Sequence, residues 1–80
     1  MTIEEFNNLV TSNFDIGFNY KDIYYEISSY EKEENNIISL ADENKWFVEF
    51  TNVDQLDNYI LIDKKIKDII FDLQEDEIYY

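Results

Sequence analysis

The sequence predicts an α+β fold: a helix, an antiparallel meander of three or four strands, and two further helices packed on one sheet face. Apolar side chains recur at helical spacing in the first ten residues and again from residue 53 to residue 73. Between residues 14 and 50, apolar and polar side chains instead alternate with the period of two that is typical of half-buried strands. Strands grouped between helices favour an antiparallel sheet whose helices lie on one face.

The first helix is predicted to begin after Thr2. Thr2 and Glu5 have the spacing of a capping box, in which two side chains bind the free backbone N–H groups at a helix start. The apolar stripe that follows consists of Ile3, Phe6, Leu9 and Val10. Ser12 and Asn13 are expected to end this helix.

Strict alternation then predicts two strands joined by a tight turn. The first strand covers residues 14–20, and its apolar face consists of Phe14, Ile16, Phe18 and Tyr20. Lys21 and Asp22 form the predicted two-residue turn. The second strand covers residues 23–30, with Ile23, Tyr25 and Ile27 on its inner face.

Two shorter strands are predicted next. The polar stretch EKEENN, residues 31–36, is expected to be a loop, and residues 37–41 a short strand after it. A turn at residues 42–44 leads into a strand over residues 45–50. Its inner face is expected to carry Trp46, Val48 and Phe50.

Two helices are predicted to complete the fold. Asn52 and Gln55 repeat the capping-box spacing before a stripe made of Val53, Leu56, Tyr59 and Ile60. Asp63 is expected to cap the last helix, whose stripe consists of Ile66, Ile69, Ile70 and Leu73. Phe71 points away from that stripe.

One core is expected within a single α+β domain over residues 1–73. Its predicted members are Phe6, Leu9, Phe18, Tyr25, Ile27, Trp46, Val48, Leu56, Ile60, Ile66 and Ile70. Residues 74–80, QEDEIYY, are expected to form an acidic-aromatic C-terminal tail. Two interpretations of the tail are open: it folds back and covers Phe71, or it forms a binding epitope together with Phe71.

The chain carries 19 acidic residues against 6 lysines, a net charge of −13. Such a charge disfavours nucleic acids and anionic membranes and favours basic partners. The apolar content of 45% nevertheless predicts a folded domain. The first residues do not have the pattern of a signal peptide, and the longest aliphatic-aromatic run is four residues, Tyr59 to Ile62. We therefore expect a cytoplasmic protein, in the host cytoplasm if a phage encodes it.

Residue usage indicates the source. Asn, Ile, Lys, Tyr and Phe, which AT-rich codons encode, fill half of the chain, whereas Ala, Gly, Pro and Arg together number two. This bias is typical of a low-GC bacterium, or of a phage or mobile element that lives in one.

Most catalytic chemistry is excluded by composition. The chain contains no His and no Cys, and therefore lacks the common general base, the thiol nucleophile and the usual zinc ligands. Arginine is absent, and a single glycine cannot form a phosphate-binding loop. We expect no enzymatic activity, no cofactor and no metal.

The outer sheet face is the predicted binding surface because it mixes acids with aromatic rings, the residue types enriched at interface hot spots. Its expected residues are Asp15, Asn19, Tyr24, Glu26, Ser28, Tyr30, Phe47 and Glu49. The residues expected to bind a partner are Tyr24, Glu26, Tyr30, Phe47 and Glu49, and from the tail Glu75, Asp76, Glu77, Tyr79 and Tyr80.

The segments TIEEF, FDIGFNYKDIYYEIS, VDQL and IDKKIKDIIFDL together resemble small uncharacterised α+β proteins of low-GC Gram-positive bacteria and their prophages. In those proteins the last helix opens with an Asp-Gly-Lys type of turn, whereas Asp63-Lys64-Lys65 lacks the glycine. In size, acidity, aromatic content and αβββαα order the chain also resembles small phage-encoded anti-CRISPR proteins that inhibit type II nucleases as DNA mimics. This second likeness concerns the general character of the sequence and not alignable residues, so it identifies no site residue in this chain.

The leading functional hypothesis is a non-enzymatic acidic binding protein encoded by a phage or mobile element. It would occupy the cationic nucleic-acid groove of a bacterial defence nuclease, such as a CRISPR effector or restriction enzyme. Its partner would be a basic, nucleic-acid-binding protein, with no direct contact to nucleic acid or membrane. The alternative is a small cellular protein-interaction domain of low-GC bacteria that is acidic only for solubility.

Overall fold

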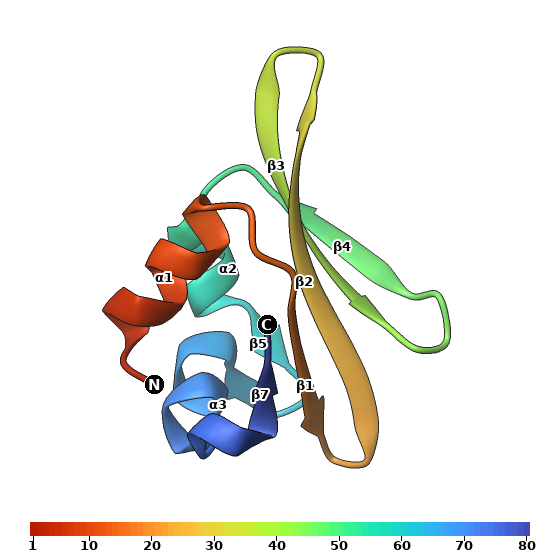
Figure 1. The fold of residues 1–80 in the computed structure, drawn as a ribbon. Helices are drawn as coiled ribbons and strands as arrows, with labels where there is room; N and C mark the ends of the chain where they lie inside the picture. Colours follow the sequence, from red (N-terminus) through yellow and green to blue (C-terminus); the bar gives the residue numbers. More distant parts are fainter.

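A five-stranded antiparallel sheet forms one layer, and three helices cover one of its faces (Figure 1). The computed structural model describes all residues from Met1 to Tyr80. The strands lie in the order β4-β3-β2-β1-β7. Their bounds are β1 Ile16–Tyr20, β2 Ile23–Lys32, β3 Asn35–Asp42, β4 Phe47–Phe50 and β7 Ile78–Tyr79. The α+β prediction is confirmed, and the sheet gains a fifth strand from the C-terminus.

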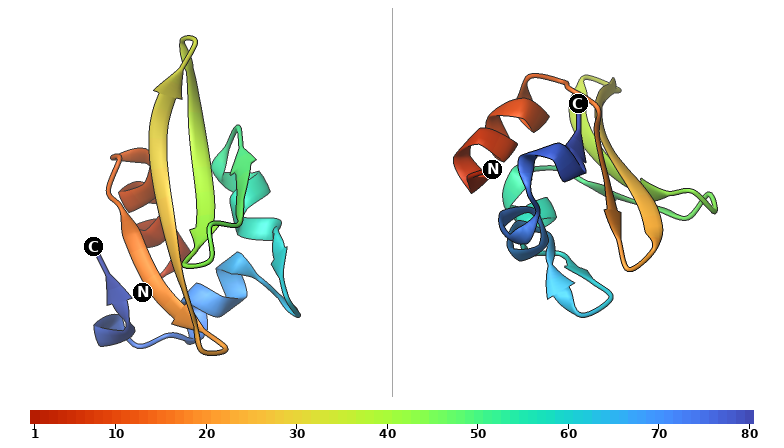
Figure 2. Two further views of the ribbon diagram at one scale, coloured as in Figure 1. Left: turned by 90° about the vertical axis from the view of Figure 1, so that its right-hand side faces the viewer. Right: turned by 60° about the horizontal axis from the view of Figure 1, so that its bottom comes forward.

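The helical layer consists of α1 Ile3–Thr11, α2 Val53–Asn58 and α3 Ile66–Asp72. A small two-stranded sheet, β5 Ile60–Leu61 with β6 Lys64–Lys65, connects α2 to α3, and the 3-10 helix η1 Glu75–Glu77 precedes β7. The views in Figure 2 place all three helices on the same side of the sheet. One sheet face therefore remains uncovered.

The predicted capping box starts α1. Thr2 Oγ1 accepts a hydrogen bond from the Glu5 N–H at 3.1 Å, and the Thr2 N–H donates to Glu5 Oε1 at 3.4 Å. At the other end Asn13 has a left-handed backbone with φ 63°, and the Phe14 N–H donates to the Leu9 carbonyl at 3.1 Å. Together with the bond from the Asn13 N–H to the Val10 carbonyl, also at 3.1 Å, this bond forms a Schellman motif. Phe14 therefore belongs to the end of the helix.

Phe14 is consequently not a strand residue, and the expectation of a strand from residue 14 is wrong by two residues. Its side chain is 49% exposed and packs edge to face against Tyr80, with ring centroids 6.5 Å apart. The turn after β1 agrees with the prediction. Lys21 and Asp22 have φ of 50° and 65°, as the two-residue turns that match strand twist require.

The stretch EKEENN is not a loop. Residues up to Lys32 continue β2, and β3 begins at Asn35, so that only Glu33 and Glu34 form the turn, with φ of 52° and 67°. This end of the hairpin projects beyond the helical layer (Figure 1). It therefore buries neither face, and a strand without a buried face needs no apolar alternation.

Two predictions in the C-terminal half are wrong. Helix α2 ends at Asn58, and Ile60 lies in β5 with 60% of its surface exposed, so it does not belong to the core. Asp63 does not cap α3, which begins after Lys65 without a side-chain cap. Asp63 lies instead in the turn between β5 and β6, where Ile62 has φ 64°.

Asp63 connects that turn to the turn between β1 and β2. Its carboxylate accepts a hydrogen bond from the Tyr20 hydroxyl and pairs with Lys21 Nζ at 3.2 Å. The bond to Asp63, together with desolvation, raises the pKa of Tyr20 to about 12, and the same bond lowers the pKa of Asp63. Two turns that lie far apart in the sequence are thus held together.

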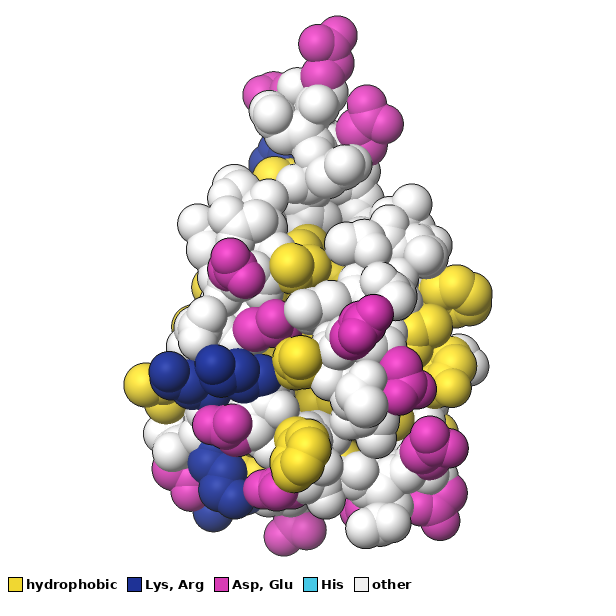
Figure 3. All heavy atoms as spheres, turned by 90° about the vertical axis from the view of Figure 1, so that its left-hand side faces the viewer, with side chains coloured by type: hydrophobic (Ala, Val, Ile, Leu, Met, Phe, Trp, Pro, Cys, Tyr) yellow, Lys and Arg dark blue, Asp and Glu magenta, His cyan; other side chains and the backbone are white.

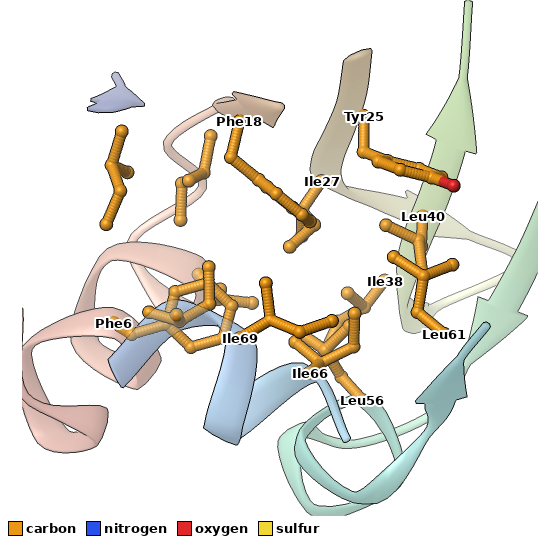
Figure 4. Packing of buried hydrophobic residues seen from close by; sticks show 14 of the residues in the cluster. Phe6, Phe18, Tyr25, Ile27, Ile38, Leu40, Leu56, Leu61, Ile66 and Ile69 are labelled. Carbon is orange, nitrogen blue, oxygen red and sulfur yellow. The ribbon is translucent and has the colours of Figure 1, made fainter. Parts of the chain in front are cut away.

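The core lies between the sheet and the helices (Figure 4). Fifteen buried apolar residues form it: Phe6, Val10, Ile16, Phe18, Tyr25, Ile27, Ile38, Leu40, Phe50, Leu56, Leu61, Ile66, Ile69, Ile70 and Ile78. Two predicted members, Leu9 and Val48, are only partly buried against it.

Trp46, also predicted to be in the core, is 40% exposed. Trp46 lies in the loop before β4, where its backbone N–H donates to Asp42 Oδ1 at 3.0 Å. The centroids of the Trp46 and Tyr59 rings are 6.3 Å apart. The Trp46 carbonyl accepts the Asp42 N–H at 2.9 Å, so backbone pairing with β3 reaches this residue, but its ring lies at the rim of the core and remains exposed.

The C-terminus returns to the sheet. Ile78 pairs with Phe18 and is 5% exposed, and Tyr79 pairs with Gly17 on the outer side. Phe71 is 72% exposed. The expectation that the tail covers Phe71 is therefore wrong. What the tail covers is the edge of β1 and the core beneath it.

Asp57 is the one buried charged residue, 6% exposed in the helical layer. Neither its Oδ1 atom nor Asn7 Oδ1 has a hydrogen-bond partner. Burial raises the pKa of Asp57 above its ordinary value of 3.8 and is the largest effect. The Asn7 side chain and the charge of Lys67 lower this pKa, and the charge of Asp54 raises it, with a net upward shift. The folded state therefore binds the Asp57 proton more tightly than the unfolded state does.

This linkage predicts a stability change with pH. A raised carboxyl pKa contributes stability that is fully present below the ordinary value of 3.8 and is lost as the pH rises through the folded value. Asp57→Asn should therefore raise the melting temperature at pH 7, and the gain should shrink as both proteins are acidified. The lowered pKa of Asp63 affects stability only below about 3.8, and there it affects both proteins alike.

Thermal melts at pH 7, 5 and 3.5 test this expectation. Glu31→Gln removes the same charge from an exposed position of β2, on the projecting hairpin, and serves as the control. A melting temperature of Asp57→Asn below that of the unmodified protein at pH 7 would show that the buried carboxylate is stabilising.

Candidate protein-binding face

The uncovered side of the sheet, here called the open face, is turned to the viewer in the left view of Figure 2. Alternation along each strand defines its residues, because neighbours in the chain point to opposite faces. They are Gly17, Asn19, Tyr24, Glu26, Ser28, Tyr30, Ile37, Ser39, Ala41, Phe47, Glu49 and Tyr79.

Strand register brings the predicted sheet residues together. One row across the sheet runs Phe47, Ala41, Glu26, Gly17 and Tyr79, and the neighbouring row runs Glu49, Ser39 and Ser28. Tyr24 and Tyr30 stand two residues to either side of these rows on β2. Asp15, expected on this face, precedes β1.

The predicted tail residues separate. Tyr79 joins the open face through β7, whereas Glu75, Asp76 and Glu77 form η1, away from it. Tyr80 packs against Phe14 near α1. The tail thus contributes one aromatic ring to the open face, while its carboxylates lie elsewhere.

Gly17, the only glycine, allows Tyr24 to lie flat over β1. A Cβ atom at this position would overlap the Tyr24 ring at its hydroxyl end. Any larger residue would push the ring outward. Burial raises the pKa of Tyr24, and the charges of Glu26 and Tyr79 raise it further. Tyr24 is consequently a neutral ring held in place beside carboxylates.

Tyr30 and Glu49 form a second aromatic-acid pair. The Tyr30 hydroxyl of β2 donates to Glu49 Oε2 of β4 and so spans β3. The Tyr30 side chain remains 40% exposed. Phe47, two residues before Glu49, is 62% exposed and adds an uncovered ring.

A shallow hollow of about 350 Å³ lies beside Tyr24 on the open face. The small side chains of Ser28, Ser39 and Ala41 line it on β2 and β3, together with Tyr24, Glu26, Asp42 and Glu43. Glu43 follows β3, and its Oε1 accepts the Tyr24 backbone N–H at 3.1 Å. The sequence did not single out Glu43 because it lies in a predicted turn. This bond, together with that of the Glu43 N–H to the Tyr24 carbonyl at 3.1 Å, brings Glu43 to the open face.

No lysine lines this hollow. Lys21, in the turn after β1, pairs with Asp63, and Lys64 of β6 pairs with Asp72 of α3. Lys32 lies near the tip of the projecting hairpin and Lys45 in the loop before β4. The carboxylates of the open face are therefore not neutralised by a cation of the same chain.

Acidic side chains are not restricted to the open face. Figure 3 shows them across the helical side and at the tip of the hairpin, with lysines interspersed on the lower part. No three or more of the chain's acids are arranged so that they could hold a metal ion. Exposed rings and carboxylates without cations between them distinguish the open face.

No family model matches the chain, and comparisons with curated proteins and with solved structures find no similar protein. No helix has the length and apolar content needed to cross a membrane. The chemistry of the open face is thus the basis for a functional proposal.

Proposed function

We propose that this chain is a non-enzymatic acidic binding protein whose open face occupies the cationic groove of a nucleic-acid-binding protein. The observation that carries the proposal is the set of carboxylates beside aromatic rings without a lysine among them: Glu26 and Glu49 lie beside the half-buried Tyr24 and the exposed Tyr30 and Phe47. Basic grooves owe much of their nucleic-acid affinity to phosphate contacts, which carboxylates on a rigid sheet can imitate.

The aromatic rings supply what charge alone does not. Exposed ion pairs contribute little affinity, whereas desolvated aromatic anchors dominate interface energies. Tyr24 is held over Gly17 and Tyr30 is held by Glu49, so neither ring loses much freedom on binding. Charge would steer the partner, and the rings would hold it.

The proposed class of target is a bacterial defence nuclease, either a CRISPR effector or a restriction enzyme. The low-GC residue usage and the likeness to small acidic anti-CRISPR proteins support this choice. The spread of acids over the helical side favours the alternative, a protein-interaction domain whose acids serve solubility. The two differ in whether charge on the open face matters more than charge elsewhere.

Charge reversal at two positions tests this difference. Glu26→Lys with Glu49→Lys should weaken inhibition of DNA cleavage by at least about tenfold, because charges lost from a desolvated interface cost several kcal/mol. The control, Glu4→Lys with Asp68→Lys, makes the same charge change at exposed positions of α1 and α3. A type II CRISPR nuclease and a panel of restriction endonucleases from low-GC Gram-positive bacteria are the assay enzymes.

Inhibition should also weaken steeply with salt and be relieved by excess duplex DNA. Circular dichroism must show that all variants fold, since Glu49 accepts the Tyr30 hydroxyl. The proposal would be contradicted if the open-face double variant and the control double variant lost inhibition equally. It would also be contradicted if inhibition did not change with salt concentration. Failure to inhibit any enzyme of the panel would favour the alternative.

A further inference from the structure

We infer that the hollow on the open face is a receptor for an arginine side chain of the partner. The hollow is the one lined by Tyr24, Glu26, Ser28, Ser39, Ala41, Asp42 and Glu43. The inference rests on the proposed function for the identity of the partner alone. The preference for arginine over lysine follows from the shape and chemistry of the hollow itself.

The shape of the hollow suits a flat group. Its middle is lined by Ser28, Ser39 and Ala41, which lie side by side on β2 and β3 in the central part of the sheet. Larger residues surround these small side chains: Tyr24 and Glu26 on β2 and Phe47 on β4, directly opposite Ala41. A planar guanidinium can lie on such a floor while its apolar stem contacts a ring.

The hydrogen-bonding capacity of the hollow points the same way. The Glu26 carboxylate has no hydrogen-bond or ion-pair partner in the protein, and Glu43 uses Oε1 alone, for the Tyr24 N–H. Both oxygens of Glu26 and Oε2 of Glu43 thus remain available, whereas Oδ1 of Asp42 already accepts the backbone N–H groups of Asn44 and Trp46. A guanidinium presents five N–H donors in one plane, whereas an ammonium is a point charge with three.

The Tyr24 ring completes the receptor. A cation close to an aromatic face is attracted by the ring, and arginine makes this contact more often than lysine. Gly17 lets the ring lie against β1, and this position makes it one wall of the hollow. Arginine would therefore meet carboxylates and a ring in one place, without rearrangement of the protein.

Other occupants fit less well. No group of acids can hold a metal ion, and a phosphate would be repelled by Glu26 and Glu43. A second copy of this chain would bring another net charge of −13 and no arginine. Charge complementarity therefore favours a basic, arginine-containing segment of a different protein.

The test uses two peptides of equal length and charge, one alternating arginine with glycine and one alternating lysine with glycine. Calorimetry should show that the arginine peptide binds at least about tenfold more tightly, since planar bidentate pairing and ring stacking act together. In amide NMR spectra, the largest shifts should fall at Ser28, Ser39 and Ala41.

Two variants separate charge from shape. Glu26→Gln keeps the size of the side chain but removes its charge, and it should lower arginine-peptide affinity by about tenfold. Ala41→Leu fills the hollow without a charge change, and it should abolish the preference for arginine. Glu4→Gln on α1 is the matched charge control and should retain the preference.

Equal binding of the two peptides would overturn the inference, as would Glu26→Gln behaving like Glu4→Gln. Glu26→Gln removes no contact within the protein, so the test holds even if Ala41→Leu fails to fold. Inhibition of a nuclease without an arginine preference would sustain the proposed function and reject the receptor. If both variants abolish the arginine preference but the protein inhibits no nuclease, the receptor is sustained and the proposed function is rejected.

Discussion

Replacing Phe18 with alanine is expected to lower the free energy of unfolding by about 3–5 kcal/mol, a large share of the 5–15 kcal/mol typical of small domains. The Phe18 side chain is fully buried in the middle of the sheet. It stacks on Tyr25 with ring centroids 5.6 Å apart and pairs with Ile78 of β7. Its removal would leave a cavity that three strands line. Urea denaturation followed by circular dichroism measures the loss.

Trp46→Ala is the matched aromatic control. The sequence pattern predicts a similar loss at this position, but the Trp46 side chain is 40% exposed, and the residue precedes β4. We therefore expect a clearly smaller loss than for Phe18→Ala. Equal losses for the two variants would mean that Trp46 contributes to the core, contrary to its exposure.

Ending the chain after Leu73 is expected to destabilise the protein by at least the roughly 2–5 kcal/mol that follows from removing a buried isoleucine. Ile78 is 5% exposed, and with it the truncation removes the backbone pairing of β7 with β1. The edge of β1 and the core beneath it would then face water. Thermal melting of the truncated and complete chains measures the effect.

Point variants distinguish the two roles of the tail. Ile78→Ala should reproduce most of the stability loss without affecting the composition of the open face. Tyr79→Ala removes a ring that is 52% exposed and should leave the melting temperature nearly unchanged while weakening partner binding. A truncated protein that melts like the complete chain would contradict the place of β7 in the sheet.

The helix start at Thr2 and the first hairpin were predictable because their signals are local. A capping box involves four consecutive residues, and the alternation of β1 and β2 has one buried face to generate it. The open-face residues of β2 and β4 were predictable for the same reason. Glu26 and Ser28 flank the buried Ile27, and Glu49 precedes the buried Phe50.

Prediction failed for segments that bury no face, that are too short to show a period, or whose partners are distant in the sequence. The hairpin tip buries no face, and a strand as short as Ile78–Tyr79 has no period to detect. Asp63 looks like a helix cap by spacing, but its partners, Tyr20 and Lys21, lie more than forty residues away in the chain. Side chains with long-range partners cannot be assigned from neighbours in the sequence.

The sequence by itself determined the α+β class, the acidic charge, and the alternation that places Tyr24, Glu26, Tyr30, Phe47 and Glu49 on one face, because each depends on composition or local period. Only the tertiary structure decided that Ile78 enters the core, that Tyr79 rather than the tail acids joins the open face, and that Glu43 lies beside Glu26 around a hollow. These features depend on pairing between distant segments. Such pairing forms only when the whole chain buries its apolar surface at once.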